Sequence, residues 1–536
     1  MSIVSIDYGN HSTKIYNFYN GVFKNIMSPT GNTTIPSRIV FCKNNRLFGD
    51  FSIYSNKSLY NNLKSKLFDE FNIYNTKIKY LTYQEQDIDQ LFLTYMYINN
   101  IVKHIHFNLK KSVIPDLYIC TFPDYIHHDN VKTYKILINE CGIKKNMLIP
   151  ESIAIGLDHG LYKLMNNFYN TSTNILFIDI GQVHVSFYLI NYHKREMKVI
   201  FKWFIEDIGA SRIDKELTRF LYDIFVKKYN IEEDCHQDKD KIMKKIYYNC
   251  ENFRKSLNTN KKIQCNIEAL WKDYNLQTII TRDDYYNCVK NQYNKFRNSL
   301  IVFKHNFKIN SIELLGGLSR FYIYNEILQE LYNKSLIKTT LNREECIAKG
   351  GTIYGANSMT LYKNIDIKIK YKYQYSNLYI KVDNRNPVLL ISREDYIPLE
   401  KNIKLSTKIN KVEIYEEGNK SPLYKMNIPD KELKVIVGFD LIHHFIYKSI
   451  LNNRIDELND THYNHIKTFR LKEVELNKLD IEYHDKQTLI NNIEEHIFDF
   501  KNKGKDVEKL ERWLNEKSID SSLKEIKDFY HKIKEK

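Results

Sequence analysis

The order of hydrophobic and polar positions predicts strands in the first and middle parts of the chain and helices at its end. Short apolar runs at 3–6 and 175–178 each lead into an Asp-x-Gly sequence, the pattern of a strand that ends in a tight turn. Between 365 and 375, Ile and Tyr alternate with Asp, Lys and Gln, which predicts a strand with one face in water. Further short strands are expected at 378–382, 388–392, 412–415 and 433–439.

The end of the chain has a helical period instead. Apolar residues recur every three or four positions in three stripes: Leu489, Ile493, Ile497 and Phe500; Leu510, Trp513 and Leu514; and Leu523, Ile526, Phe529, Tyr530 and Ile533. Each stripe places its apolar side chains on one helix face, and Lys503-Gly504 separates the first stripe from the second. Mutual packing of these faces into a helical bundle is the simplest expectation.

The two Asp-x-Gly turns are the strongest candidates for chemistry. Asp7 with Gly9, and Asp179 with Gly181, place a carboxylate and backbone N–H groups at the end of a strand. Such N–H groups bind phosphate oxygens, and such carboxylates can hold a hydrated Mg²⁺. A lone Asp-x-Gly is more often an ordinary turn, so the prediction depends on the pair. The pair predicts two halves of a domain that hold one nucleotide between them.

Several motifs around these turns resemble the heat shock protein 70 family, whose nucleotide-binding domain has the actin and sugar-kinase fold. Three of them are Asn32-Thr33-Thr34-Ile35-Pro36-Ser37-Arg38, Cys250-Glu251-Asn252-Phe253-Arg254-Lys255-Ser256-Leu257 and Leu314-Leu315-Gly316-Gly317-Leu318-Ser319-Arg320. Stretches at 45–50, 62–64, 151–161 and 339–350 also resemble family motifs, and all keep the family's order. The resemblance implies an α/β fold with a two-lobed, actin-like ATPase domain at 1–360.

The resemblance also implies roles for individual residues. ATP would bind between the lobes, where Asp7 and Asp179 would hold Mg²⁺ through water. Lys64 would face the phosphates, and Lys64 and Glu151 would be the catalytic pair in a weak or vestigial form. The remaining implied nucleotide contacts are Gly9, Asn10, His11, Gly181, Gln182, Glu251, Arg254, Lys255, Asn258, Gly316, Gly317 and Arg320.

The second turn departs from the foldase branch of the family. That branch reads Asp-Leu-Gly-Gly-Gly-Thr-Phe-Asp, whereas residues 179–186 read Asp-Ile-Gly-Gln-Val-His-Val-Ser. Gln182 and Val183 add Cβ atoms where backbone should approach phosphate, and Ser186 removes a carboxylate. ATP binding could survive these changes, but efficient hydrolysis could not, so at most a weak ATPase is expected.

This pattern is similar to the large heat shock protein 110 subfamily, the nucleotide exchange factors of the foldase. The similarity implies an ATP-binding co-chaperone that drives adenyl-nucleotide exchange on a cytosolic heat shock protein 70 foldase and could also hold unfolded chains. Two other functions stay open. A divergent ATP-hydrolysing foldase would use Glu151 to couple hydrolysis to peptide release. A sugar or acetate kinase of the same fold would need a substrate loop, and none is recognisable.

We therefore expect three domains. These are an actin-like nucleotide-binding domain at 1–360, a reduced β-sandwich-like domain at 361–439 and a C-terminal helical bundle at 440–536. The chain has 536 residues, of which 43% are hydrophobic, so it is long and apolar enough for several cores.

Charge and cysteine usage narrow the partners and the compartment. The net charge is +15, but the lysines are dispersed and no zinc spacing or RNA-binding signature accompanies them. Nucleic acid is therefore not expected as a partner, whereas an acidic protein is compatible. The eight cysteines are isolated, as in a reduced cytosolic protein. No signal peptide or run of about 20 apolar residues is present, so we expect a cytoplasmic protein without membrane contact.

Overall fold

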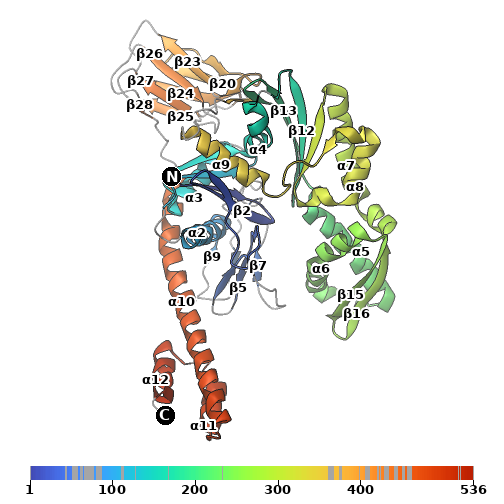
Figure 1. Cartoon of the computed structure of the whole chain (residues 1–536), viewed down its shortest axis with the longest axis vertical. Coiled ribbons are helices and arrows are strands. Elements are labelled where there is room, and N and C mark those ends of the chain that lie inside the picture. Colours follow the sequence, from blue (N-terminus) through green and yellow to red (C-terminus); the bar gives the residue numbers. More distant parts are fainter. Residues whose placement is uncertain are drawn as a thin grey trace.

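The fold is described from a computed structural model (Figure 1). It describes residues 2–42, 45–50, 58–60, 64, 78–79, 87–109, 114–126, 128–166, 168–231, 233, 235–359, 367–372, 377–397, 399–404, 411–418, 422, 424–427, 434–439, 445–449, 453–454, 461–516, 518 and 521–534. Two lobes lie side by side, a region rich in strands lies above the first lobe, and a long helix, α10, runs down its outer side (Figure 1).

The first lobe is built on a mixed sheet of order β11-β10-β1-β2-β3. The central strand β1 (Ser2–Tyr8) is antiparallel to β2 (Ser12–Tyr19) and parallel to β10 (Leu117–Phe122). It is buried along its whole length, so Ser5 and Asp7 are shielded from water together with Ile3, Val4 and Ile6. The other elements of this lobe are β3 (Val22–Asn25), β4 (Ile35–Pro36), β5 (Ile39–Phe41), β6 (Arg46–Phe48), β7 (Ser58–Tyr60), β8 (Ile78–Lys79), β9 (Asp87–Ile88), α2 (Gln90–Asn108), α3 (His128–Glu140), β11 (Asn146–Pro150) and α4 (Glu151–Met165).

The second lobe repeats this topology. Its sheet has the order β18-β17-β12-β13-β14-β19-β22, and β12 (Thr173–Ile180) is again antiparallel to its hairpin partner and parallel to a later strand. A duplicated mixed sheet is consistent with an actin-like ATPase fold. The other elements are β13 (Val185–His193), β14 (Glu196–Ile205), α5 (Ala210–Tyr229), η1 (His236–Asp238), α6 (Lys239–Thr259), β15 (Lys262–Trp271), β16 (Tyr274–Thr281), α7 (Arg282–Asn306), β17 (Ser311–Leu315), η2 (Gly317–Arg320), α8 (Tyr322–Leu331), η3 (Lys334–Leu336) and β18 (Ile337–Lys338). The next helix, α9 (Cys346–Ser358), returns to the first lobe and packs on β1, β2 and β10.

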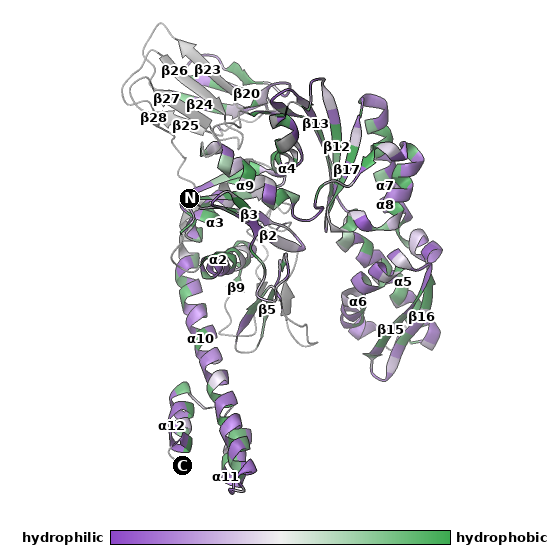
Figure 2. Ribbon diagram, in the orientation of Figure 1, coloured by the Kyte–Doolittle hydropathy of each residue, from purple (hydrophilic) through white to green (hydrophobic). Residues whose placement is uncertain are grey.

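The two lobes meet where α4 crosses α9. A Cβ atom on Gly350 of α9 would lie 1.9 Å from the carbonyl oxygen of Ala154 on α4, so the backbones are in contact there. Only glycine permits this approach. Figure 2 shows apolar residues on both helices and on the strands beside them, and one buried cluster joins Ile3 of the first lobe to Phe177 of the second.

The region after residue 360 contains the predicted strands. β19 (Lys368–Lys372) covers the middle of the strand expected at 365–375, whose remaining residues lie outside the described residues except Ile367. The strands expected at 378–382, 388–392, 412–415 and 433–439 are confirmed within one residue at either end. They form two four-stranded sheets with β20 (Leu378–Val382), β21 (Val388–Ile391), β24 (Lys411–Glu416) and β25 (Tyr424–Asn427) in one, and β23 (Leu399–Lys404), β26 (Lys434–Phe439), β27 (Phe445–Ser449) and β28 (Asn453–Arg454) in the other.

Two features of this region differ from expectation. β27 and β28 extend the second sheet into residues that we expected to be helical, because a short apolar run between turns has no period that separates strand from helix. In addition, β19 pairs in parallel with β14, and β22 (Tyr396–Ile397) pairs with β19. The start of this region is therefore part of the second lobe's sheet.

The C-terminal helices are α10 (Thr461–Asn502), α11 (Glu508–Glu516) and α12 (Leu523–Lys534), which contain the three predicted stripes. Gly504, at φ +72°, separates the first two helices as expected. At the far end, the ring of Trp513 stacks 3.6 Å from that of Phe529. The first half of α10 instead packs on the first lobe, where Phe469 lies 5.0 Å from Phe92. The predicted helical bundle is therefore present only at the far end, where the last part of α10 packs with α11 and α12.

Candidate nucleotide-binding site

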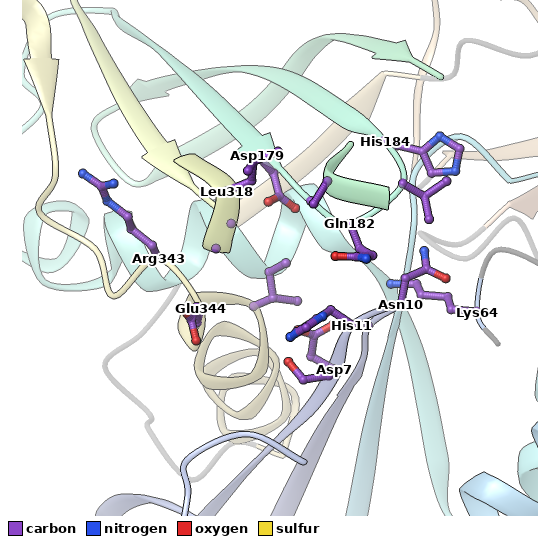
Figure 3. A pocket seen from close by; sticks show the side chains of 18 of the residues that line it. Asp7, Asn10, His11, Lys64, Asp179, Gln182, His184, Leu318, Arg343 and Glu344 are labelled. Carbon is purple, nitrogen blue, oxygen red and sulfur yellow. The ribbon is translucent and has the colours of Figure 1, made fainter. Parts of the chain in front are cut away.

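A cavity of about 400 Å³ lies between the two lobes, within the usual size range of small-molecule sites. In Figure 3, Asp7 and His11 of the first turn face Asp179 and Gln182 of the second turn across it. The predicted site residues that line it are Asp7, Gly9, Asn10, His11, Lys64, Glu151, Asp179, Gly181, Gln182, Glu251, Arg254, Lys255, Gly316, Gly317 and Arg320. The topology thus gathers the separate motifs at one place.

Asn258 does not line the cavity. Its side-chain oxygen accepts a hydrogen bond of 2.9 Å from the backbone N–H of Tyr322, and its carbonyl oxygen accepts one of 2.7 Å from Arg282. This residue lies in the last turn of α6 and holds that helix to the start of α8. Its role in the fold is therefore to position α6 rather than to contact a ligand directly.

Three carboxylates and two lysines form the centre of the cavity. Asp7 is almost fully buried and lies 3.5 Å from the ammonium group of Lys14. Lys64 and Glu151, both buried, form a direct ion pair. Asp179 has no ion pair with a described residue at this centre. The cluster consequently carries one more negative than positive charge when all five groups are ionised.

Burial and this charge imbalance shift the protonation of the cluster. Burial, assisted by the charge of Asp7, raises the pKa of Asp179 to about 6. Burial also raises the pKa of Glu151, although the attraction of Lys64 opposes that shift. Burial alone would lower the pKa of Lys64, but the neighbouring carboxylates together raise it. The cluster therefore favours binding an additional positive charge.

The donor set fits Mg²⁺, a hard cation that binds oxygen ligands and keeps much of its water shell. Asp7 and Asp179 supply carboxylate oxygens from the ends of β1 and β12. Within the described residues, no three acidic, histidine or cysteine side chains converge closely enough to hold a metal directly. These residues would accordingly hold the ion through its bound water, and the ion would neutralise phosphate charge in the cavity.

The second turn is closed by its own backbone. The N–H of Gly181 donates to the carbonyl of His184 at 3.1 Å, and the start of α5 caps the turn through Gly209 N–H to Val183 at 3.1 Å and Ser211 N–H to Gln182 at 2.8 Å. The Gly181 N–H is thus engaged within the protein. This arrangement makes the turn rigid and leaves fewer backbone donors for a phosphate than a run of glycines would offer.

The opposite end of the cavity is formed by α6 and by the loop between β17 and η2. Arg254 is buried and paired with Asp214 at 2.8 Å, whereas Lys255 is exposed and paired with Glu251 at 2.7 Å. Gly316 has φ +78°, and a Cβ atom on it would lie 2.4 Å from a carboxylate oxygen of Asp179. Glycine is required here by both conformation and space.

Several residues of the cavity were not predicted. Lys14 lies two positions after Ser12 on β2, so both side chains face the cavity, and the period of two could have indicated it. Tyr125 of the first lobe contacts His184 of the second turn, with ring centroids 4.7 Å apart. Arg343 and Glu344 precede α9 in a stretch that we related to the family without assigning either residue a role.

Comparisons with known proteins agree with this architecture. Residues 3–413 match the family described as Hsp70 protein. The chain is 23% identical over 294 residues to Heat shock 70 kDa protein 16 of Arabidopsis thaliana, covering 54% of this chain and 38% of that protein. It is 24% identical over 292 residues to Heat shock protein 88 of Dictyostelium discoideum, covering 51% and 36%. It is 23% identical over 260 residues to Heat shock protein 110 of Caenorhabditis elegans, covering 47% and 33%.

The aligned part of this chain spans only 33% to 38% of the length of each of these relatives. The predicted resemblance to the large members of the family is confirmed by their names. Among the helices that the structure describes, none has the length and apolar character needed to cross a bilayer. Since the family match covers most of the sequence and the two-lobed domain lies within it, the chain belongs to the heat shock protein 70 family.

Proposed function

We propose that this protein is an ATP-binding co-chaperone that acts as an adenyl-nucleotide exchange factor for a cytosolic heat shock protein 70 foldase. The observation that carries the proposal is the second turn. It keeps Asp179 in the cavity, yet its backbone is closed on itself and carries Gln182 and His184. Such a site favours the binding of ATP and Mg²⁺ rather than hydrolysis of the ATP.

Binding is supported by the parts of the cavity that are complete. Asp7 and Asp179 supply the oxygens for a hydrated Mg²⁺, and Lys14 and Lys64 bring positive charge to the same place. The approach of Gly316 to Asp179 connects the nucleoside end of the cavity to this centre. A ligand that contacts both ends would therefore hold the two lobes in one relative position.

The proposal of weak ATP hydrolysis is supported by two side chains of the cavity, Ser186 and Glu151. Ser186, which replaces the second aspartate of the foldase turn, cannot accept a proton or orient a metal as a carboxylate does. Glu151 is tied to Lys64 in a buried ion pair and is less available to act as a base. Each lost positioning group costs roughly a factor of 10²–10³ in comparable sites.

Nucleotide exchange on the foldase would result from the shape of this protein rather than from ATP hydrolysis. The β19–β14 pairing fixes the strand-rich region to the second lobe, and α10 is fixed to the first. ATP between the lobes would set the angle between these two attachments. A foldase held by that shape would be favoured in its nucleotide-free form, and by linkage its affinity for ADP would fall. The strand-rich region could also hold unfolded chains in the cytosol.

The test measures release of fluorescent ADP from a cytosolic foldase with and without this protein. We expect faster release when the protein is loaded with Mg-ATP, and no acceleration by Asp179→Asn, which removes a carboxylate from the cavity. Equal acceleration by the wild type and by Asp179→Asn would show that nucleotide in this protein is not involved. No acceleration by either would refute exchange activity.

The alternative is a divergent ATP-hydrolysing foldase, because Lys64 and Glu151 are both present in the cavity. Its signature would be ATP turnover that rises when a J-domain protein and a peptide are added. Turnover at the level of an authentic foldase would favour this alternative over exchange. We expect turnover to stay near background.

A further inference from the structure

The register of the first hairpin places Lys14 beside Asp7. The two residues are direct partners across the antiparallel pair of β1 and β2, so their side chains lie on the same face of the sheet. The ammonium group of Lys14 lies 3.5 Å from a carboxylate oxygen of Asp7. It also lies 3.3 Å from the Cβ position on Gly9, against the first turn. Pairing of the two strands is therefore sufficient to bring this cation to the turn.

The ion pair of Lys14 and Asp7 is shielded from water. The side chain of Asp7 is 4% exposed and that of Lys14 is 15% exposed. Among the residues that the structure describes, neither side chain has a second ion-pair partner. The other carboxylate oxygen of Asp7 accepts a long hydrogen bond of 3.5 Å from the hydroxyl of Thr121 on β10. Both oxygens of Asp7 are thus engaged within the protein, and a hydrated metal ion has to compete with Lys14 for them.

The charge of Lys14 also acts on the second turn. Burial raises the pKa of Asp179, and the attraction of Lys14 is the next largest influence and opposes that shift. Lys64 is bound directly to Glu151 and has a smaller influence on Asp179. One ammonium group therefore partly neutralises both of the carboxylates that would hold Mg²⁺ through its bound water.

We propose that Lys14 is a positioning residue that holds the cation position beside Asp7 and thereby makes the binding of Mg²⁺ depend on the nucleotide. The inference rests on the proposed Mg-ATP site and assigns the order in which its ligands bind. Lys14 and Mg²⁺ repel each other at this short range, so the metal alone binds weakly. The phosphates of ATP supply enough negative charge for both cations to be present together.

A contact with phosphate alone is the competing role for Lys14. The two roles differ in what they predict for metal without nucleotide. Loss of a phosphate contact would leave the binding of Mg²⁺ unchanged. Loss of a competing cation would strengthen it, because the centre of the cavity would then have three carboxylates and one lysine in place of three carboxylates and two lysines.

The test titrates Mg²⁺ alone into the ligand-free protein and measures its affinity by calorimetry. Lys14→Met keeps a long side chain and removes its charge. We expect this variant to bind Mg²⁺ about 10- to 100-fold more tightly than the wild type, because one positive charge near the ion is lost. Lys14→Gln, which keeps a polar side chain, should show the same gain. Partial unfolding cannot mimic this result, because it would weaken the binding of metal.

Three further variants make the result specific. Lys14→Arg keeps the charge and should bind Mg²⁺ as weakly as the wild type does. Adding Asp7→Asn to Lys14→Met removes the carboxylate that the lysine had neutralised, so the gain should disappear. Lys198→Met is the matched control, because it breaks an ion pair of a strand lysine with Glu196 outside the cavity, and it should bind Mg²⁺ like the wild type.

The outcomes separate this inference from the proposed function. Equal affinity for Mg²⁺ in the wild type, Lys14→Met and Lys14→Gln would overturn the role of Lys14, whether or not Mg-ATP binds. A gain that persists without Asp7, or that Lys198→Met shares, would also overturn it. If the wild type does not bind Mg-ATP, the proposed function fails. Tighter binding of Mg²⁺ alone by Lys14→Met would even then support the competition between the lysine and the metal.

Discussion

The centre of the cleft contains more acidic than basic side chains. The stability of the folded protein therefore depends on which proton or cation neutralises the excess negative charge. Asp179 bears part of this cost because it is buried, is repelled by the charge of Asp7 and has neither lysine as its direct ion-pair partner. Buried carboxylates in this situation favour a proton or a cation over the free anion. The same feature that destabilises the empty protein therefore favours Mg²⁺ with a nucleotide.

The first prediction concerns the pH dependence of stability. The pKa of Asp179 in the folded protein, about 6, lies above its ordinary value, so folding is favoured when this group is protonated. Its contribution to stability is present at about pH 4 and is lost as the pH rises to about 6. Asp179→Asn should therefore stabilise the ligand-free protein by about 3 kcal/mol at neutral pH, and this gain should disappear at about pH 4.

Urea unfolding of both proteins across this pH range measures that difference. Asp116→Asn is a suitable control because its carboxylate contacts the backbone of Ser2 at the edge of the first lobe, away from the cleft. A gain from Asp179→Asn that is equal at all pH values would show that titration of this group is not the cause. Mg-ATP should raise the melting temperature of the wild type and not that of Asp179→Asn.

The second prediction uses two adjacent glycines. Gly316→Ala places a Cβ 2.4 Å from Asp179 and forces alanine into φ +78°, whereas a Cβ on Gly317 would approach no atom more closely than 3.8 Å. We expect Gly316→Ala to cost about 2–4 kcal/mol and to abolish ATP binding. Gly317→Ala should leave both nearly unchanged. Thermal melts with and without Mg-ATP compare the two, and similar behaviour would contradict the geometry of the loop.

At the scale of elements, α10 is attached to the first lobe by a buried charge cluster. The guanidinium of Arg46 pairs with Glu473 at 2.7 Å and with Asp480 at 2.7 Å, and its side chain is fully buried. The apolar contact of Phe469 with Phe92 and Tyr95 lies next to it. Buried pairs of this kind add little net stability, but losing one partner is costly.

The third prediction follows from this cluster. Arg46→Met leaves Glu473 and Asp480 without their partner and should weaken the attachment of α10 by about 3–5 kcal/mol. Hydrogen exchange should then become faster in α10 and along the facing side of α2. Arg512→Met removes an exposed pair with Glu508 on α11 and serves as the control, with little change expected. Unchanged exchange in Arg46→Met would mean that apolar packing alone holds the helix.

Elements with a local signal were predictable from sequence, and those that depend on distant partners were not. The strands at 378–382 and 412–415 alternate, and the stripe from Leu489 to Phe500 has a helical period. The face of α10 that contacts the first lobe includes Glu473 and Asp480 among its apolar residues. Their partner, Arg46, is 427 residues from Glu473 in the sequence, so no local pattern reports the contact.

The residues of the cleft can also be divided into those that the sequence predicted and those that it did not. Asp7, Glu251 and Gly316 lie within motifs whose spacing carries their role, and the cavity contains all three. Arg343 lies in a stretch that resembles a family motif, but the sequence indicated no role for it, because its position depends on hydrogen bonds to Gly316 and Ser319 that form only when the lobe folds. Sequence patterns therefore located the two turns and the base loop but not the charges that surround them.

At the scale of the whole molecule, the two lobes, the strand-rich region and α10 are joined at separate places. The α4–α9 crossing joins the lobes, β19 joins the strand-rich region to the second lobe, and α10 docks on the first. None of the described residues after 360 lines the cavity. Nucleotide binding and attachment of the C-terminal helices are therefore separable by truncation.

The fourth prediction compares two truncations. Ending the chain after residue 460 removes α10 and exposes the side of Phe92 and Tyr95 that Phe469 covers, so the first lobe should lose stability while ATP still binds. Ending it after Asn502 removes only α11 and α12 and should leave the first lobe unchanged. Melting curves, nucleotide affinity and foldase ADP release are the measurements. We expect the first truncation to lose exchange activity; full activity without α10 would place the partner surface elsewhere.

The length of α10 beyond its docked part makes it a lever arm. From Asp480 to Asn502 the helix measures about 33 Å, so a tilt of about 5° at the first lobe moves its tip by about 3 Å. The tip carries the cluster formed with α11 and α12. A change in lobe angle too small to detect inside the cleft would be magnified there, and two fluorophores, at the tip and on the second lobe, would report the state of the nucleotide site from a distance.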